Sequence, residues 1–308
     1  MASARAGLLQ RCRKGLTKMP SLSIVVTTYN RKDLVAQLIA ELEQQSDPDF
    51  QLIVAIDGST DGTADMLAGS RTPFDLKWID TECRGYGLAV ARNRGILAAD
   101  GEAVVILDDD SFPDPDFVTE HKACVTAGVM TGGPRHPSDP RETRMVWKMQ
   151  ELAKLPSCTP LDFETLHRDW PNAYMIENNL CMRRQDWISA GLFSERLKMY
   201  GFIGQEFFAR ARHLNLRYQF NPRAAVCHRG EYEGNNGLQR KDKTFQTRLA
   251  SILRPALMKP KHYRAQIAWS RALADDAPPP GMPAYWPDVA TSIMARGARR
   301  VGRTIAGR

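Results

Sequence analysis

The chain has 308 residues, of which 43% are hydrophobic and 25% charged, and this composition excludes a wholly disordered protein. It fits one large globular domain with extensions. No apolar run approaches the roughly 18–20 residues needed to cross a bilayer. The N-terminus lacks the apolar stretch of a signal peptide. We therefore expect a cytoplasmic protein.

The formal net charge of +7 is concentrated at the two ends of the chain. Residues 1–20 and 289–308 each carry five basic side chains and no acidic one. Without these ten residues, 32 basic side chains remain against 35 acidic ones, which argues against a nucleic-acid partner. Residues 289–308 also carry apolar side chains on a four-residue spacing. This predicts either a helix that contacts an anionic membrane, at the inner face of the plasma membrane, or a disordered basic tail.

The six cysteines are scattered and form no Cys-x-x-Cys pair. This argues against a zinc ribbon or a redox motif and favours a reducing compartment. Each cysteine is expected to be a small buried apolar residue.

Apolar strand-like segments alternate with helical ones in the first third of the chain. In chain order they are a strand at 22–26, a helix face at 34–42, strands at 51–56 and around 77–79, a helix at 87–99 and a strand at 103–107. Because the strands are nearly all apolar, they are typical of parallel strands covered on both faces. We predict an α/β fold with a mostly parallel, Rossmann-like sheet and helices on both faces. Beyond about residue 236 the pattern becomes helical.

Polar residues follow three of these strands where each one ends: Asn30, Asp57 and Asp108–Asp110. In parallel sheets ligands bind outside the carboxyl ends of the strands. Three consecutive aspartates at the end of a buried strand are costly unless a cation or hydrogen-bond donors offset their charge. Hard cations such as Mg²⁺ or Mn²⁺ take oxygen ligands and complete their shell with substrate phosphates. The alternative for the triplet is a solvated acidic turn.

Four segments occur in the order seen in family 2 glycosyltransferases of the GT-A fold, which the chain resembles from about residue 21 to 230. They are Ser-Ile-Val-Val-Thr-Thr-Tyr-Asn-Arg at 23–31, Asp-Gly-Ser-Thr-Asp at 57–61, Ala-Arg-Asn-Arg-Gly at 91–95 and Leu-Asp-Asp-Asp at 107–110. The resemblance implies a GT-A domain at 21–235, with a nucleotide-binding half (21–131) and an acceptor-binding half (132–235). A basic tail (1–20) precedes it, and a helical extension with a basic tail (236–308) follows.

The resemblance also implies a donor site. Its nucleotide-sugar contacts would be Thr27, Tyr29, Asn30, Asp57, Arg92, Asp108 and Asp109. Tyr29 would stack on the base, Asp57 would accept a hydrogen bond from the base edge, and Asp108 or Asp109 would hold the ribose. Asp110 and His228 would bind Mn²⁺ or Mg²⁺, which stabilises the leaving diphosphate.

Four of these residues also have a possible structural role that involves no ligand. Tyr29 would be a half-buried core aromatic, Asp57 a turn or helix cap, Arg92 a surface ion pair and His228 a structural histidine.

Residues 198–210 resemble the acceptor-side segment of the family, with Gln205-Glu206 where Glu-Asp is usual. Glu206 would be the catalytic base that takes the proton of the acceptor hydroxyl. Its alternative role is at a helix start, where a carboxylate interacts with the helix dipole. Gln205 and Asn179 would contact the acceptor. Trp170 and Trp187 would be either sugar-stacking platforms or core residues.

These residues predict inverting transfer of a hexosyl or N-acetylhexosaminyl group from a nucleoside diphosphate sugar. Asp57 favours a uridine nucleotide. The acceptor would be a glycan, a lipid-linked glycan or a small molecule. The alternatives are a nucleotidyltransferase and a catalytically inactive nucleotide-sugar-binding homologue. A nicotinamide enzyme is disfavoured, because Gly85-Tyr-Gly87 lacks the third glycine of the dinucleotide motif.

Overall fold

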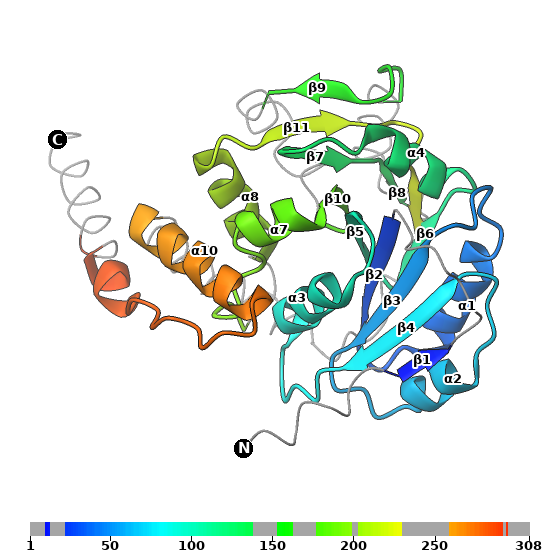
Figure 1. Ribbon diagram of the computed structural model, residues 1–308, viewed down its shortest axis with the longest axis horizontal. Helices are drawn as coiled ribbons and strands as arrows, with labels where there is room; N and C mark the ends of the chain where they lie inside the picture. Colours follow the sequence, from blue (N-terminus) through cyan, green and yellow to red (C-terminus); the bar gives the residue numbers. More distant parts are fainter. Residues whose placement is uncertain are drawn as a thin grey trace, which may run out of the picture. The chain divides into compact units, whose positions relative to one another are not determined.

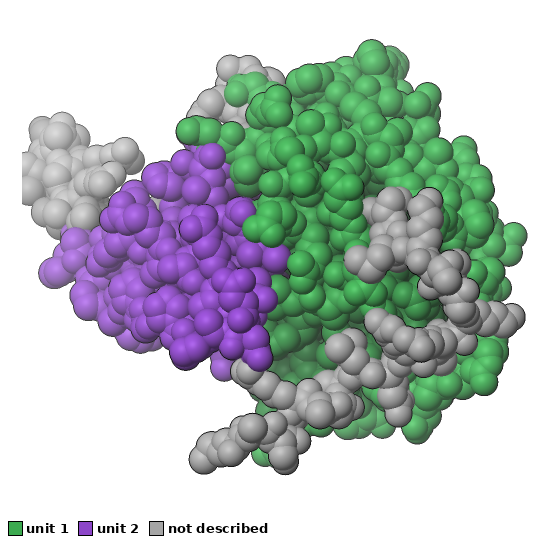
Figure 2. All heavy atoms as spheres, in the orientation of Figure 1, with its two compact units in different colours: residues 1–187, 215–234 green, residues 188–214, 235–308 purple. Residues whose placement is uncertain are grey.

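The computed structural model describes residues 10–12, 22–137, 153–162, 177–198, 203–229, 259–291 and 294, which Figure 1 draws as coloured ribbon. The chain divides into two compact units, residues 1–187 with 215–234 and residues 188–214 with 235–308 (Figure 2). This division groups residues 188–214 with the C-terminal segment, whereas the predicted boundary lies at residue 235. No helix in the described part of the chain is long and apolar enough to span a membrane.

A nine-stranded sheet forms the centre of the first unit. Strands β2, β3, β4 and β5 are parallel, and β10 runs antiparallel between β5 and β7. The predicted mostly parallel α/β sheet is therefore confirmed. In sheet order the strands are β1 (Gln10–Cys12), β4 (Asp75–Asp80), β3 (Gln51–Ile56), β2 (Leu22–Thr28), β5 (Ala103–Asp108), β10 (Asn179–Arg183), β7 (Val129–Gly132), β11 (Arg217–Phe220) and β9 (Thr159–Leu161).

Helices cover both faces of the parallel strands, as their uniformly apolar sequences predict (Figure 1). Alternate strand residues such as Ile24 and Val26 share one core with α1 (Lys32–Leu42) and α2 (Thr63–Gly69). On the opposite face, α3 (Leu88–Ala98) brings Gly95 so close to Val25 that a Cβ would lie 2.3 Å from Val25 Cγ1. A glycine is needed there for helix and strand to pack.

A small three-stranded sheet brings a late part of the chain to the end of β5. It consists of β6 (Ser111–Pro113), β12 (Val226–His228) and β8 (Arg135–Pro137). Strand β12 pairs antiparallel with β6, so His228 lies opposite Ser111. The Arg229 N–H also donates to the Asp110 carbonyl oxygen at 2.9 Å. This pairing places His228 beside the aspartate triplet.

The second unit is helical where it is described. It contains α8 (Ile203–His213) and α10 (Pro260–Ala274), and α7 (Arg184–Ser189) leads into it. From α10, Gln266 donates to the Gly191 carbonyl oxygen and Ser270 to that of Ile188, both at 2.9 Å. These bonds hold the segment after α7 against α10.

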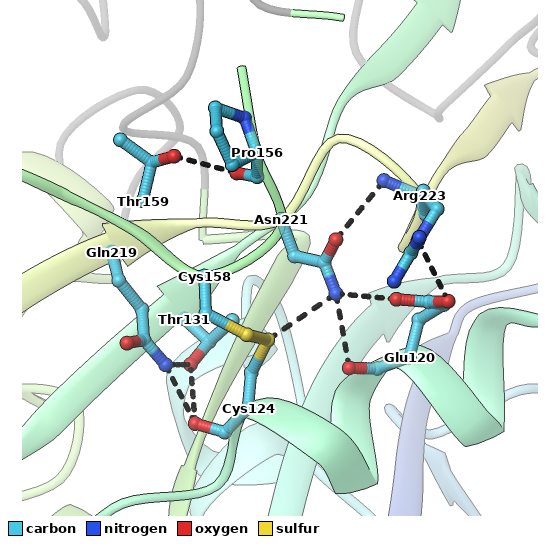
Figure 3. The surroundings of a disulfide bond; sticks show 9 residues. All are labelled: Glu120, Cys124, Thr131, Pro156, Cys158, Thr159, Gln219, Asn221 and Arg223. Atoms are coloured by element: carbon cyan, nitrogen blue, oxygen red, sulfur yellow. Dashed lines mark hydrogen bonds and ion pairs between the residues drawn. A yellow bond between two sulfur atoms is a disulfide. The ribbon is translucent and has the colours of Figure 1, made fainter.

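A disulfide joins Cys124, at the end of α4 (Phe117–Cys124), to Cys158, just before β9 (Figure 3). Asn221 donates to Cys124 Sγ at 3.3 Å and Gln219 donates to the Cys124 carbonyl oxygen at 2.6 Å, as Figure 3 shows. The expectation that each cysteine is a single buried residue is therefore wrong for this pair. Sequence spacing does not reveal it, because the two cysteines meet only through folding of the segment between them.

Replacing both Cys124 and Cys158 with alanine should lower the free energy of unfolding by about 3–4 kcal/mol, because the bond closes a loop of 34 residues in the unfolded chain. Denaturant unfolding with and without a thiol reductant measures this. Reductant should destabilise the wild type and leave the double variant unchanged. An unchanged wild type would contradict the prediction.

Candidate active site

Four strand ends meet at one edge of the main sheet. The pairing registers place Thr27 beside Asp108, Thr28 beside Ile56, and the start of the antiparallel β10 beside the end of β5. The residues that follow β2, β3 and β5 therefore share one edge with the first residues of β10. This confirms the sheet arrangement on which the predicted donor site depends.

Asp108 is held by a buried arginine. Arg92 on α3 donates from Nη2 to Asp108 Oδ1 at 2.8 Å and from Nη1 to Glu177 Oε1 at 3.1 Å. Burial alone would lower the pKa of Arg92, but the two carboxylates outweigh it and raise that pKa. The alternative of a surface ion pair does not hold, because the Arg92 side chain is 1% exposed.

Asp109 accepts hydrogen bonds from two sides. Thr28 Oγ1 donates to Oδ2 and Arg31 Nη1 donates to Oδ1, both at 2.7 Å. Burial raises the pKa of Asp109 to about 7, against the lowering effect of Arg31. The end of β2 and the loop that follows it therefore hold this carboxyl group.

Asp110 is anionic at neutral pH and has one oxygen to spare. Oδ2 lies 3.1 Å from Arg31 Nη1 and 3.4 Å from His228 Nε2. Oδ1 is buried and has no hydrogen-bond partner in the described part of the chain. Burial would raise the pKa of Asp110, but His228, then Arg135 and Arg31, lower it to about 2. The structure thus brings the two predicted metal ligands, Asp110 and His228, together.

This pair fits a divalent cation. A buried, negatively charged oxygen without a partner is what a cation or donor must satisfy. Within the described ranges, no group of three or more His, Cys, Asp or Glu side chains could hold a metal ion. A cation on Asp110 and His228 would therefore take its other ligands from substrate phosphates and water, as Mg²⁺ commonly does.

Asp57 is held in place by the loop before α3. Its Oδ2 accepts a hydrogen bond from the Gly87 N–H at 2.9 Å, and burial raises its pKa although Gly87 and the Cys83 thiol act to lower it. A Cβ at Gly87 would lie 2.0 Å from Asp57 Oδ1. The residue that caps α2 is Gly62, so the helix-cap alternative for Asp57 is wrong.

The other predicted base-side residues differ in exposure. Tyr29 is 47% exposed, so about half of its surface is open to a ligand. Thr27 is buried, and its Oγ1 has no partner among the described residues. Asn30 adopts a positive φ of 50°, donates its N–H to Ser59 Oγ and accepts from the Thr60 N–H. Its amide oxygen is thus used to join two loops of this edge.

Glu206 and its neighbour Gln205 lie on α8 in the second unit. Both oxygens of Glu206 accept hydrogen bonds from Arg210, at 3.0 and 2.9 Å, and the carboxylate is buried. Arg210 also donates to the carbonyl oxygens of Ala190 and Leu192. Gln205 is exposed. Glu206 is therefore part of a buried ion pair that joins α8 to the segment after α7.

The family model described as Glycosyl transferase family 2 matches residues 23–191, more than half of the chain. The chain belongs to glycosyl transferase family 2. The match begins in β2 and includes Asp57, Arg92 and the aspartate triplet.

A curated glycosyltransferase is also similar to this chain. Validoxylamine A glucosyltransferase of Streptomyces hygroscopicus subsp. jinggangensis is 29% identical over 209 residues, covering 59% of this chain and 49% of the relative. The chain thus spans about half the length of that curated relative.

Two solved structures share the fold. The mannosyltransferase PcManGT from Pyrobaculum calidifontis, in complex with GDP-Man and Mn²⁺, matches with a TM-score of 0.52 and 21% identity over 95% of this chain and 82% of its own. TarS of S. aureus, in complex with UDP-GlcNAc, matches with 0.52 and 18% identity over 82% of this chain and 73% of its own. The GT-A fold is therefore confirmed.

Two of the roles considered for residues of this chain lose support from the contacts. Asn179 is buried, its amide nitrogen donates to the Ala224 carbonyl oxygen at 2.8 Å and its oxygen pairs with His121 Nε2 at 2.9 Å. These bonds leave it little capacity for an acceptor. Trp187 is fully buried and donates to the Val104 carbonyl oxygen, so it is a core residue and not a sugar platform. Trp170 lies outside the described residues.

Four residues of the site were missed in the sequence. Arg31 and Arg135 flank Asp110, Glu177 pairs with Arg92, and the buried Asn178 keeps an unpartnered Oδ1 within the described structure. The sequence does contain a signal for the last two, because Glu177 and Asn178 directly precede the strand β10. Because β10 pairs antiparallel with β5 and begins opposite Leu107, residues 177 and 178 lie next to the triplet.

Proposed function

We propose that this family 2 enzyme transfers a sugar, with inversion, from a nucleoside diphosphate sugar to an acceptor hydroxyl. The observation that carries the proposal is the meeting of Asp110 and His228 at 3.4 Å, with Asp110 Oδ1 buried and unpartnered in the described structure. Asp57 and Tyr29 at the same sheet edge supply a place for the nucleobase.

The donor side follows from the chemistry of each group. Asp57, fixed by Gly87, can accept a hydrogen bond from the N3–H of uracil, and the exposed ring of Tyr29 can stack on the base. Asp108, fixed by Arg92, can accept from the ribose hydroxyls. TarS has been crystallised with UDP-GlcNAc and PcManGT with GDP-Man, which supports a nucleotide-sugar donor. We favour a uridine nucleotide for this chain.

Asp110 and His228 would hold Mn²⁺ or Mg²⁺. When bound, the cation supplies Lewis-acid stabilisation of the negative charge on the leaving nucleoside diphosphate. The PcManGT complex, which contains Mn²⁺, supports this assignment. The residues themselves contribute a low-pKa carboxylate and an imidazole on one side of the site.

Glu206 is the proposed base for the acceptor hydroxyl. An inverting transfer needs a carboxylate to take the hydroxyl proton as the oxygen attacks the anomeric carbon. The acceptor would have to share Glu206 with Arg210, which now engages both carboxylate oxygens. The alternative to a catalytic role is that Glu206 serves only as the structural partner of Arg210. The two roles predict different transfer rates for variants of Glu206 and Arg210.

Calorimetric titration of the protein with UDP-sugars and GDP-sugars, with and without Mn²⁺, tests the proposed function. We expect Mn²⁺-dependent binding of a UDP-sugar, and transfer to a glycan, lipid-linked or small acceptor. Release of pyrophosphate from a nucleoside triphosphate and a sugar phosphate would favour the nucleotidyltransferase. Metal-dependent binding without transfer would favour the inactive homologue. If no nucleotide sugar binds, the proposal is wrong.

We also propose that the C-terminal end contacts an anionic membrane surface. Trp286 and Met294 are 61% and 67% exposed, and residues 289–308 add five arginines and no acid. Replacing these five arginines with glutamine should weaken the affinity for phosphatidylserine vesicles, measured by co-sedimentation, about a thousandfold, since each basic residue near such a surface contributes roughly 1 kcal/mol. Neutral vesicles serve as the control. Equal co-sedimentation of both proteins with the anionic vesicles would refute the membrane contact.

A further inference from the structure

One buried arginine holds two carboxylates at neighbouring strand ends. Arg92 Nη2 lies 2.8 Å from Oδ1 of Asp108, the last residue of β5, and Arg92 Nη1 lies 3.1 Å from Oε1 of Glu177, just before β10. The Arg92 side chain is 1% exposed, whereas those of Asp108 and Glu177 are 32% and 23% exposed. The arginine therefore lies inside the protein, and both carboxylates are accessible to a ligand.

Each carboxylate keeps one oxygen for a further bond. Asp108 Oδ2 and Glu177 Oε2 have no hydrogen-bond partner in the described part of the chain. The two carboxylates and the single guanidinium of Arg92 leave an excess of negative charge, which repels an anion such as a phosphate. A cation on these oxygens would lie close to the guanidinium and is disfavoured for the same reason. Neutral hydroxyl groups fit, because a carboxylate only accepts hydrogen bonds and a hydroxyl can donate one.

A buried hydroxyl on the same face of the sheet also lacks a partner. Thr27 is paired with Asp108 in the register of β2 and β5, so both side chains point to one face. This is the face that α3 covers, because Val25 shares the orientation of Thr27 and packs against Gly95 of α3. Thr27 Oγ1 is buried and has no hydrogen-bond partner among the described residues. Such a group normally finds a partner in a bound molecule or water, which points to a ligand beside Asp108.

We propose that Glu177 is a specificity-determining residue that binds the ribose hydroxyls of the donor nucleotide together with Asp108. The inference rests on the proposed function and deepens it, because that function requires only Asp108 at the ribose. Ribose presents two neighbouring hydroxyl groups, and Arg92 fixes two carboxylates that can accept from them. A hydrogen bond to a charged acceptor is stronger than one between neutral groups, so the pair should distinguish ribose from a sugar without these hydroxyls.

Calorimetry with UDP and with 2′,3′-dideoxy-UDP, both at saturating Mn²⁺, tests this role. We expect the wild type to bind UDP about a hundredfold tighter than the dideoxy analogue, since each hydrogen bond to a charged group contributes about tenfold or more. Glu177→Met should bind UDP about tenfold weaker than the wild type does and should bind the analogue equally well, so that the preference falls to about tenfold. Glu177→Gln, whose amide oxygen can still accept a hydrogen bond from Arg92, should show an intermediate preference.

Glu102→Met is the matched control. Glu102 lies just before β5, at the opposite end of that strand from Asp108, and its Oε1 is 3.5 Å from Arg183 Nε. This variant also removes a carboxylate that pairs with an arginine, but at the other end of the strand. We expect its affinities for both nucleotides to equal those of the wild type. Thermal unfolding of each variant shows whether the fold is retained.

The outcomes separate this inference from the proposed function. If Glu177→Met weakens the binding of both nucleotides by the same factor, or changes neither, the inference is overturned while the donor site stands. The inference also fails if this variant binds UDP normally and UDP-glucose more weakly, because the carboxylate would then contact the transferred sugar. If the wild type binds neither UDP nor any UDP-sugar with Mn²⁺, the proposed function is overturned as well. A loss confined to the nucleotide with ribose hydroxyls supports the inference, because a loss of structure would weaken both.

Discussion

Replacing Asp110 with asparagine should reduce Mn²⁺ affinity more than a hundredfold and bring transfer close to background. Changes at residues that only support metal ligands typically cost about 10–100-fold, so the loss of a ligand charge should exceed that range. Asp110 is the member of the triplet whose pKa is lowered, to about 2, and whose Oδ1 has no partner within the described ranges. The neutral amide keeps the shape of the side chain and removes the charge that would attract the cation.

Two further variants make this result specific. His228→Gln should weaken Mn²⁺ binding by a smaller factor, because an amide oxygen can still act as a ligand in place of the imidazole. Asp114→Asn changes an exposed aspartate a few residues after the triplet and should bind Mn²⁺ like the wild type. Retention of Mn²⁺-dependent UDP binding by Asp110→Asn would show that the cation is held elsewhere.

Glu206→Gln should lower transfer by about 10²–10⁴-fold, while leaving Mn²⁺–UDP binding unchanged. A glutamine can still accept hydrogen bonds from Arg210, but it cannot take the proton of an acceptor hydroxyl. Donor binding is spared because Asp57, Arg92 and the triplet belong to the first unit. Initial rates with a saturating donor, together with calorimetry of UDP binding, measure the two effects.

Arg210→Met separates the base role from the structural one. Removing the charge of either partner of a buried ion pair costs about 3–5 kcal/mol, so both Arg210→Met and Glu206→Gln should be less stable than the wild type. The Arg210→Met variant keeps the Glu206 carboxylate. At temperatures well below its unfolding midpoint, this variant should therefore retain measurable transfer. Should Arg210→Met instead lose as much transfer as Glu206→Gln, the ion pair would be structural, and Glu206 would not be the base. Arg210→Lys provides a milder change if the methionine variant unfolds.

The fold could be predicted because it is encoded in local patterns of apolar residues. Apolar strands such as Leu22–Thr28 and Gln51–Ile56 are buried along their whole length, and a parallel sheet places the residues after them at one edge. Asp57 and the triplet could be assigned to one site on that ground. The pairing of Asp110 with His228 was foreseen only through the family resemblance, because it depends on the distant β6–β12 contact.

Other parts of the site depend on contacts that a single sequence does not show. Glu177 pairs with Arg92 because β10 runs antiparallel beside β5, and this pairing joins residues that are more than 70 positions apart in the sequence. The bonds that use up the amide of Asn179, and the unpartnered Oδ1 of its neighbour Asn178 in the described structure, could not be read from the sequence. The ion pair of Glu206 with Arg210 follows from helical spacing, but its burial does not. Because Glu206 is buried against Arg210, it could serve either as a catalytic base or as a structural ion-pair partner.

We propose that Asp110 and His228 would hold a cation that stabilises the diphosphate of a nucleotide bound at the edge formed by β2, β3 and β5. A crystal structure with UDP and Mn²⁺, with data collected at the manganese absorption edge, tests it most directly. The account predicts an anomalous peak within about 2.0–2.3 Å of Asp110 and His228, with the uracil against Asp57 and Tyr29. A diphosphate bound away from this edge, or manganese with no contact to Asp110, would contradict it.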